Sequence, residues 1–361
     1  MARHALADAP VALATIAGLR MTAGASRRTR VAIVLALAIL VANAVAFRHA
    51  WRMLHFTDAG TRTVPPEELT TWRKLGVLIT GVTIPKPRNE RTPAALGLPF
   101  ETRHLTTRDS VDLEAWWIPV HESRGVVVLF HGYAGRKSTM LEEARAFGEM
   151  GYSTLLVDQR GHGGSAGRKT SIGYHESADV EAAVEFARKA EPHGTIVLYG
   201  QSMGAVSIFR ALAVNRVPAA AVIVEGIYDE TLHTIRNRFA AMGVPSFPAA
   251  ELLTLWGGVQ NGFWAFGHNP VRYASGVHGR ALFLHGLEDP RASAREARRV
   301  FERVEARKTW IEFGAGHEPL IRTSEKRWKR GVQTFLSGGI WMESFRQGPP
   351  PLDRKPGIPL R

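Results

Sequence analysis

The chain has 361 residues, of which 45% are apolar and 22% are charged. These shares are typical of a globular protein and exclude disordered and collagen-like chains, and the length fits one large α/β domain with extensions. The formal net charge of +13 is spread along the sequence without a nucleic-acid-binding motif, so we interpret it as a source of solubility and of attraction to a membrane surface. The chain has no cysteine, which excludes disulfides, thiolate metal sites and a cysteine nucleophile.

An uncharged apolar run covers residues 31–47 near the N-terminus. Its length is at the lower limit of what spans a hydrocarbon core of roughly 30 Å, so the sequence predicts a transmembrane signal-anchor. Basic residues are more frequent before this run than after it, and the positive-inside rule therefore places residues 1–30 in the cytoplasm and the following domain on the extracytoplasmic side. The arginines before the run are Arg20, Arg27, Arg28 and Arg30, and those that follow it closely are Arg48 and Arg52.

Other readings of this N-terminal segment stay open. Ala42-Asn43-Ala44 offers a cleavage site for a signal peptidase, and removal of the segment near Ala44 would leave a secreted or periplasmic protein. A buried core helix is disfavoured because the run has no polar face. Met21 could be the true first residue, since it opens a compact segment that is first charged and then apolar.

Residues 48–99 are predicted to form a linker along a surface. Pro85 and Pro87 lack amide donors and favour extended neighbours, so a regular helix should end there. The apolar patch at residues 75–84 would either pack on the domain or contact lipid. Residues 337–361 contain five prolines and are expected to form a loosely ordered tail.

From residue 100 to 336 short β-branched runs alternate with amphipathic helical stretches. This pattern predicts an α/β domain with a mostly parallel central sheet flanked by helices on both faces. Residues 228–279 interrupt the alternation with prolines, glycines and six phenylalanine and tryptophan residues, so we expect a helical cap inserted over the carboxyl edge of the sheet. The predicted strands are 111–119, 125–130, 153–157, 195–199, 220–224, 281–284 and 309–313, and the predicted helices are 138–150, 174–190, 203–215, 292–306 and 324–336.

Ser202 lies between two glycines, in Gly200-Gln201-Ser202-Met203-Gly204, where a buried strand meets a helix. A serine on such a sharp turn is strained, and its hydroxyl projects above the sheet as a nucleophile. The amide of Met203 would lie at the positive N-terminal end of the helix, where it can stabilise an oxyanion. The plain alternative is a tight strand-to-helix turn without chemistry.

A second turn, His131-Gly132-Tyr133, follows an earlier strand. The flexible backbone of this turn can offer the amide of Tyr133 to the same oxyanion. We interpret His131 as a structural hydrogen-bonding residue and not as a base.

With these motifs the chain resembles the α/β-hydrolase family, in its monoacylglycerol-lipase-like and serine-aminopeptidase-like branch. The resemblance covers residues 100–336 and rests on four segments in order, which are residues 131–132, 158–165, 200–204 and 314–317. The segment Asp158-Gln-Arg-Gly-His-Gly-Gly-Ser165 matches a loop whose implied role is structural support beside the site. His162 is therefore a poor candidate base.

His317 follows the last predicted strand in a glycine-rich loop. Such a loop lets the imidazole reach the serine, take its proton and later donate it to the leaving group. Its position after the nucleophile and the acid matches the chain order serine, acid, histidine. The alternative is a loop histidine without a role.

The acid is expected among carboxylates near the next-to-last strand. Asp289 matches the HGxxD pattern of the family, and the resemblance implies that it orients the imidazole. The sequence departs from the family at residues 290–293, where a valine-proline pair is frequent, and this leaves the geometry of the loop open. We interpret Glu288 as a solvated charge in the loop, and Glu225 and Asp229 are the alternatives to Asp289 as the acid.

These residues predict acyl transfer to Ser202 followed by hydrolysis of the acyl-enzyme. Esters, thioesters and amides all fit, and the aromatic residues of the cap favour a carboxylic ester with an apolar or lipid-like acyl part, although such residues are as often core packing. The rivals are a small-peptide peptidase and a catalytically silent binding module at a membrane. The sequence shows no metal-ligand spacing and no nucleotide motif, so no cofactor and no nucleic-acid partner are expected.

Overall fold

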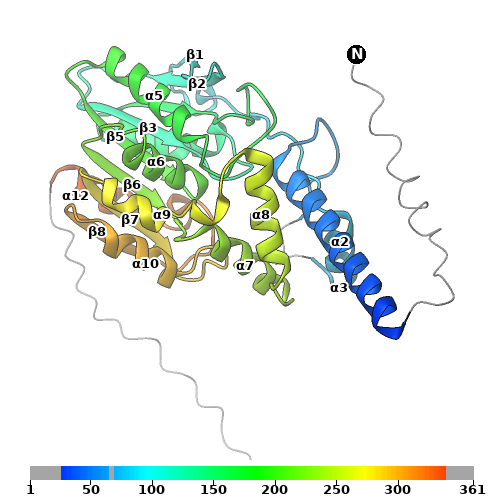
Figure 1. Ribbon diagram of the computed structural model, residues 1–361. Coiled ribbons are helices and arrows are strands. Elements are labelled where there is room, and N and C mark those ends of the chain that lie inside the picture. Colours follow the sequence, from blue (N-terminus) through cyan, green and yellow to red (C-terminus); the bar gives the residue numbers. More distant parts are fainter. Residues whose placement is uncertain (1–25, 65–68, 339–361) are drawn as a thin grey trace, which may run out of the picture.

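The computed structural model describes residues 26–64 and 69–338, and it contains an eight-stranded sheet with the order β1-β2-β4-β3-β5-β6-β7-β8 (Figure 1). β2 pairs antiparallel with β1 and β4, and the other pairs are parallel. The predicted mostly parallel sheet is thus confirmed. The strands are β1 (Glu101–Thr106), β2 (Asp112–Ile118), β3 (Gly125–Phe130), β4 (Ser153–Val157), β5 (Thr195–Gln201), β6 (Ala221–Glu225), β7 (Arg280–Gly286) and β8 (Lys308–Phe313).

Seven of these strands agree with the predicted runs, and β1 is the strand that the sequence analysis missed. Five of its six residues are exposed, and Leu105 is the buried one. A strand at the edge of a sheet with so few buried side chains carries no continuous apolar pattern. The central strands β3, β4 and β6 are buried along their whole length, as expected for strands covered on both faces.

Helices cover both faces of the sheet (Figure 1). One apolar cluster packs α5, α6, α9 and α10 on one face, and a second cluster packs α4 and α12 on the other. These helices and the short ones beside them are η2 (Pro93–Leu96), η3 (Lys137–Met140), α4 (Leu141–Glu149), α5 (Ser177–Ala190), α6 (Met203–Ala213), α9 (Pro270–Tyr273), η5 (Ala274–Gly276), α10 (Ala294–Arg303), α11 (Leu320–Thr323) and α12 (Glu325–Leu336).

The segment predicted as a cap contains the helices α7 (Thr231–Met242) and α8 (Ala249–Asn261), followed by η4 (Ala265–Gly267) and then by α9 and η5. α7 and α8 share a third apolar cluster with the N-terminal helix α2 (Arg27–Leu54), in which Ala50 packs near Phe239 and Leu253. The N-terminal helix α2 therefore helps to hold the cap helices in place through apolar contacts.

Helix α2 has 28 residues and is, within residues 26–64 and 69–338, the helix long and apolar enough to cross a membrane. Side chains such as Val34 and Ile39 are more than 60% exposed, and in Figure 1 this part of the helix projects from the body. The predicted run 31–47 lies inside α2, but the helix continues to Leu54. Ala50 and Leu54 are buried there, and packing against α8 stabilises the extra turns.

The region predicted as a linker is partly helical. Its first residues belong to α2, and α3 (Thr71–Thr80) contacts both α2 and the cap, where Lys74 Nζ donates to the Met242 carbonyl at 2.8 Å. The helix ends at Thr80 with Gly81 as its C-cap, before the two prolines that were expected to stop it. The basic segment up to residue 25, with Met21, and the proline-rich tail from residue 339 lie outside the described residues.

Candidate active site

Ser202 stands on a strained turn between β5 and α6. Its φ of 49° and ψ of −112° are in a region that residues with a side chain rarely adopt. A Cβ on Gly204 would come within 2.2 Å of the Phe130 carbonyl oxygen, and one on Gly200 within 2.6 Å of the Ala205 amide nitrogen. The two glycines thus allow the close approach of strands and helix that forces the serine side chain outward.

The structure brings Ser202, His317 and Asp289 together, although they lie far apart in the sequence. His317 Nε2 is 3.1 Å from Ser202 Oγ, and His317 Nδ1 is 2.6 Å from Asp289 Oδ2. Ser202 follows β5, Asp289 follows β7 and His317 follows β8, and the parallel pairing of these strands through β6 places their carboxyl ends at one edge of the sheet. The residues chosen from the sequence are therefore within hydrogen-bond reach of one another.

The Asp289 carboxylate is buried and fixed on both of its oxygens. Oδ1 accepts the amides of Arg291 at 2.8 Å and Ala292 at 2.9 Å, while Oδ2 faces His317. Burial opposes ionisation, but the hydrogen bond and charge of His317 together with the two amides outweigh it and hold the pKa of Asp289 below its ordinary value. The side chain is thus an ionised acceptor whose orientation is set by the loop.

The other carboxylates that the sequence left open make different contacts. Glu288 is exposed. Glu225 accepts from Trp328 Nε1 at 2.5 Å and from the Leu320 amide at 3.3 Å. Asp229 pairs with Arg299 at 2.5 Å and binds His233. Within the described residues, Asp289 is the one carboxylate of these four that contacts His317.

His131 and His162 lie beside the site without contacting Ser202. His131 Nε2 accepts the Gln159 amide at 3.1 Å, and His162 Nδ1 contacts the Arg160 carbonyl at 2.9 Å. Burial lowers the pKa of His131, and burial together with the neighbouring His131 lowers the pKa of His162 to about 3. Both imidazoles hold the loop at residues 158–165 in place, in line with the structural reading of the sequence.

The backbone of the turn at residues 131–133 lies against the serine. A Cβ on Gly132 would be 3.4 Å from the Ser202 Cβ. The Met203 amide opens α6 and is one of the four that lack an acceptor within a helix. Among the described residues the Tyr133 amide donates no hydrogen bond. Both amides that the sequence predicts as oxyanion donors thus remain available beside Ser202.

A buried acidic residue behind the serine was missed by the sequence analysis. Glu143 of α4 accepts from Gln201 Nε2 at 2.9 Å, and Gln201 directly precedes Ser202. Burial and the neighbouring Glu225 raise the pKa of Glu143 to about 8. Its other carboxyl oxygen is buried and has no hydrogen-bond partner among the described residues, as suits a protonated group. An acidic residue in an amphipathic helix carries no sequence signal for burial.

An apolar pocket of about 880 Å³, including its open mouth, extends from Ser202 and His317. Its walls come from three helices, with Ala50 and Leu54 on α2, Ile235 on α7 and Leu253 on α8. The N-terminal helix is thus part of the pocket, which the sequence analysis did not foresee because residues 48–99 read as a linker.

The aromatic residues of the cap contribute less to this pocket than expected. Of the six phenylalanine and tryptophan residues in the segment, Phe263 lines the pocket. Trp256 packs edge-on against Phe47 of α2, and Phe247 and Trp264 are exposed. The apolar character of the pocket comes mainly from aliphatic side chains.

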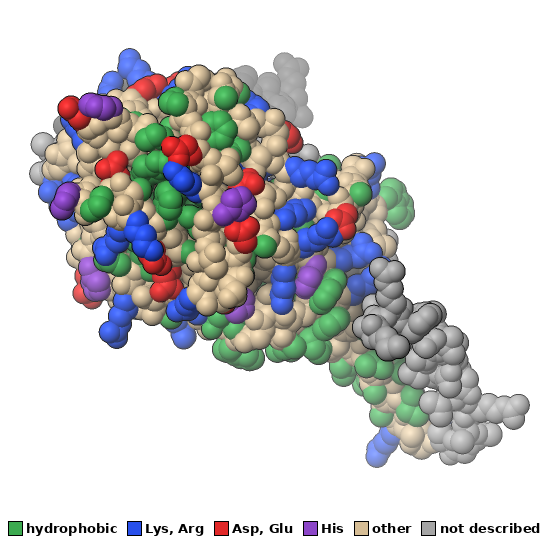
Figure 2. All heavy atoms as spheres, turned by 90° about the horizontal axis from the view of Figure 1, so that it is seen from above, with side chains coloured by type: hydrophobic (Ala, Val, Ile, Leu, Met, Phe, Trp, Pro, Cys, Tyr) green, Lys and Arg blue, Asp and Glu red, His purple; other side chains and the backbone are tan. Residues whose placement is uncertain are grey.

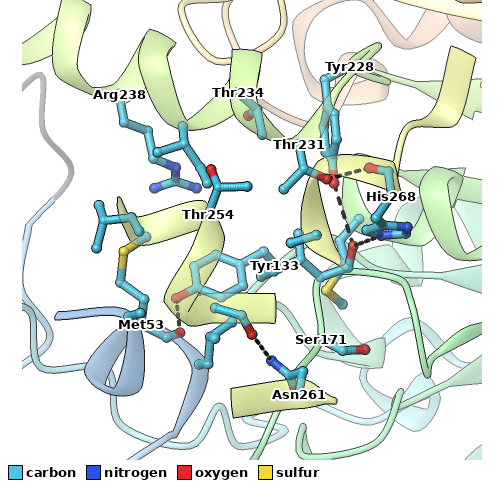
Figure 3. Close-up of a pocket in the computed structure, with 18 of the residues that line it drawn as sticks. Met53, Tyr133, Ser171, Tyr228, Thr231, Thr234, Arg238, Thr254, Asn261 and His268 are labelled. Carbon is cyan, nitrogen blue, oxygen red and sulfur yellow. Dashed lines mark hydrogen bonds between the residues drawn. The ribbon is translucent and has the colours of Figure 1, made fainter. Parts of the chain in front are cut away.

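Tyr133 connects this pocket to the N-terminal helix. Its hydroxyl donates to the carbonyl of Met53 at 2.5 Å, as Figure 3 shows. Burial raises the pKa of Tyr133 to about 12, so the hydroxyl stays a donor at neutral pH. Tyr133, whose amide the sequence predicts as an oxyanion donor, is thereby tied to the last turn of α2.

Asp229, His233 and Glu296 form a cluster whose ligand atoms lie within 4.8 Å of one another. These atoms already have partners, because Asp229 pairs with Arg299 and Glu296 accepts from Asn237 at 2.9 Å. The cluster therefore joins α7 to α10 through ion pairs and hydrogen bonds.

Comparison with known proteins agrees with this fold and confirms the resemblance. Residues 121–235 match the sequence model of the family described as serine aminopeptidase, S33. An uncharacterized protein of Mycobacterium tuberculosis is 30% identical over 59% of this chain and 70% of that protein, and a monoacylglycerol lipase of Mycolicibacterium smegmatis is 35% identical over 26% of this chain and 34% of that protein. The solved structure of an esterase from Pyrococcus furiosus has a TM-score of 0.60 at 24% identity and covers 70% of this chain and 97% of its own.

Proposed function

This chain belongs to the α/β-hydrolase family, in its monoacylglycerol-lipase-like and serine-aminopeptidase-like branch, and we propose that it is a membrane-anchored serine esterase. The proposal names Ser202 as nucleophile, His317 as base and Asp289 as the acid that orients the base. The observation that carries it is the chain of contacts at 3.1 Å and 2.6 Å through His317, placed at the mouth of an apolar pocket.

In the first half of the reaction the Ser202 hydroxyl attacks the ester carbonyl while His317 Nε2 takes its proton. Asp289 stabilises the resulting imidazolium and keeps the Nδ1 proton in place. The negative charge on the former carbonyl oxygen is stabilised by the amides of Tyr133 and Met203. The tetrahedral intermediate then breaks its bond to the alcohol, which receives the proton from His317 as it leaves.

In the second half a water molecule replaces the alcohol. His317 takes a proton from this water, whose oxygen attacks the acyl carbon of the acyl-enzyme. The second tetrahedral intermediate releases the carboxylic acid, and the proton on His317 returns to Ser202 Oγ. The net reaction consumes one ester and one water and gives one acid and one alcohol.

The apolar pocket supports an ester with an apolar acyl part. Its lining includes Ile172, Ile235 and Leu253, and no Asp or Glu is among the described residues that line it. A peptidase that recognises a free amine needs a carboxylate near the substrate, so the lining favours the ester over a small peptide. The monoacylglycerol lipase among the relatives agrees with a lipid-like acyl group.

Helix α2 supports a membrane location, with the N-terminus on the cytoplasmic side and the catalytic domain on the other. The anchor then has a second role as a wall of the pocket. Cleavage near Ala44 would leave this wall in the mature protein, because Ala50, Met53 and Leu54 follow the site.

The proposal is tested with the full-length protein in nonionic detergent and a panel of esters of graded acyl chain length. We expect hydrolysis with a preference for longer chains, covalent labelling by a fluorophosphonate, and loss of both in Ser202→Ala. Activity of Ser202→Ala equal to that of the wild type would refute the role of this serine. Labelling of Ser202 without hydrolysis of any ester would instead favour an amidase.

A further inference from the structure

Ser202 and His317 also line a second compartment, of about 1040 Å³ including its open side. Ser202 and His317 belong to the lining of both cavities, and so do Tyr133, Arg238 and Arg291, so the catalytic residues lie at the boundary between the cavities. An ester bound with its carbonyl at Ser202 would place its acyl chain in the apolar pocket and its alcohol in this second compartment.

The second compartment is rich in arginine. Five arginines line it, together with three acidic residues. The arginines outnumber these acidic residues, and burial raises the pKa of Glu225, which disfavours its negative charge. The lining therefore carries an excess of positive charge. The arginines are Arg62, Arg136, Arg238, Arg291 and Arg322.

Two of these arginines, Arg136 and Arg322, come from segments outside the cap. Arg136 is 23% exposed and pairs with Glu90 at 3.0 Å, and its Nε is buried without a hydrogen-bond partner among the described residues. Arg322 of α11 is exposed, and its Nη2 lies 3.4 Å from the Thr139 carbonyl oxygen. Both side chains line the same cavity as Ser202, and within the described part of the chain the buried Nε of Arg136 is a donor that still lacks an acceptor there.

We propose that this compartment binds a phosphate group on the alcohol part of the substrate. Arginine binds phosphate through paired N–H donors with matching geometry, and the excess of positive charge favours a dianion or monoanion over a neutral alcohol. The inference rests on the proposed esterase activity and narrows it. The substrate class is an acyl ester of a phosphorylated alcohol, with an apolar chain on one side of Ser202 and an anion on the other.

The membrane surface is a competing explanation for the arginines. Figure 2 shows Lys and Arg side chains near the place where the body meets the projecting apolar part of the molecule. Basic residues in such a position attract anionic lipids without binding the substrate. The test therefore uses esters that are soluble in water, because these reach the site without a lipid surface.

The experiment compares two short-chain esters, an acyl glycerol and the corresponding acyl glycerol 3-phosphate, below their micelle-forming concentrations. Full-length protein in nonionic detergent is assayed for kcat/KM on both. We expect the wild type to prefer the phosphorylated ester by about tenfold, the effect of one charge-assisted hydrogen bond. Arg136→Gln should remove most of this preference, and Arg322→Gln, an exposed side chain, should lower it about threefold. The matched control is Arg330→Gln, since Arg330 is exposed on α12 outside the compartment.

Further readouts separate charge from loss of folding. Arg136→Lys should keep part of the preference if charge matters, and glycerol 3-phosphate should inhibit the wild type competitively but Arg136→Gln far more weakly. Equal kcat/KM for the two soluble esters, unchanged by both substitutions, would overturn the phosphate site and leave the esterase proposal intact. A preference seen only with anionic vesicles would overturn it in favour of surface attraction. Absence of hydrolysis for either ester would count against the esterase proposal itself.

Discussion

Replacement of Asp289 by asparagine keeps the size of the side chain and changes one atom from acceptor to donor. The oxygen Oδ1 accepts the two amides of Arg291 and Ala292, so the remaining oxygen of the asparagine will keep that position. The new NH₂ group then faces His317 Nδ1 across the 2.6 Å contact. Two donors cannot share this contact, so the imidazole must place its proton on Nε2.

A histidine with its proton on Nε2 cannot accept the proton of Ser202. We expect kcat to fall by about 10³ to 10⁴, which corresponds to about 4 to 5.5 kcal/mol of transition-state stabilisation. KM should change little, because Asp289 does not line the apolar pocket proposed for the acyl chain and its hydrogen bonds go to His317 and to its own loop. The wrong tautomer and the lost negative charge both contribute to this effect.

The assay is initial-rate hydrolysis of one preferred ester across a range of concentrations. The control is Glu288→Gln, which changes the adjacent exposed carboxylate and should retain wild-type kinetics. Thermal unfolding of both variants checks that each remains folded. A kcat of the asparagine variant within tenfold of the wild type would show that the contact between Asp289 and His317 does not act as described.

Three further substitutions test the surroundings of the site. The pKa of Glu143 is raised from 4.5 to about 8, so the free energy of unfolding falls by up to about 1.4 kcal/mol per pH unit as pH rises through this range. Glu143→Gln removes this titration and should flatten the pH dependence of stability, which unfolding curves at pH 5 to 8 measure. Gly204→Ala should destabilise the fold by about 3 kcal/mol through its clash with the Phe130 carbonyl, seen as a lower unfolding temperature. Tyr133→Phe should lower the free energy of unfolding by about 1 to 3 kcal/mol, because the Met53 carbonyl loses its donor. It should also lower kcat more than it changes KM, and kinetics equal to those of the wild type would show that this hydrogen bond does not position the oxyanion donors.

Local patterns allowed much of the fold to be predicted. Strands buried on both faces are continuous apolar runs, and β3 and β5 were therefore found almost to the residue. The strained turn at Ser202 could be predicted because the two glycines beside it, which permit the close packing there, are part of a short local pattern in the sequence. The strand β1 was missed because its one buried side chain, Leu105, gives no periodic signal.

The features that could not be predicted depend on contacts between distant segments. The last turns of α2 are stabilised by α8, whose Gln260 donates to the Phe47 carbonyl at 2.8 Å. The hydrogen bond from Tyr133 to Met53 joins residues 80 positions apart. Neither contact has a local pattern, so the sequence analysis assigned residues from 48 onward to a linker and did not place them at the site.

Under the proposed membrane anchoring, the continuity of α2 sets the distance between the site and the lipid. The residues between Arg48 and Leu54 correspond to about 10 Å of helical rise, and Leu54 is tied to the body because its carbonyl accepts the Thr170 amide at 3.0 Å. For a helix that crosses the bilayer up to Phe47, this short helical spacer holds the pocket at a fixed distance from the hydrocarbon core of the bilayer. With this anchoring and the proposed esterase activity, we expect bilayer thickness to alter the turnover of esters embedded in the membrane but not of esters dissolved in water.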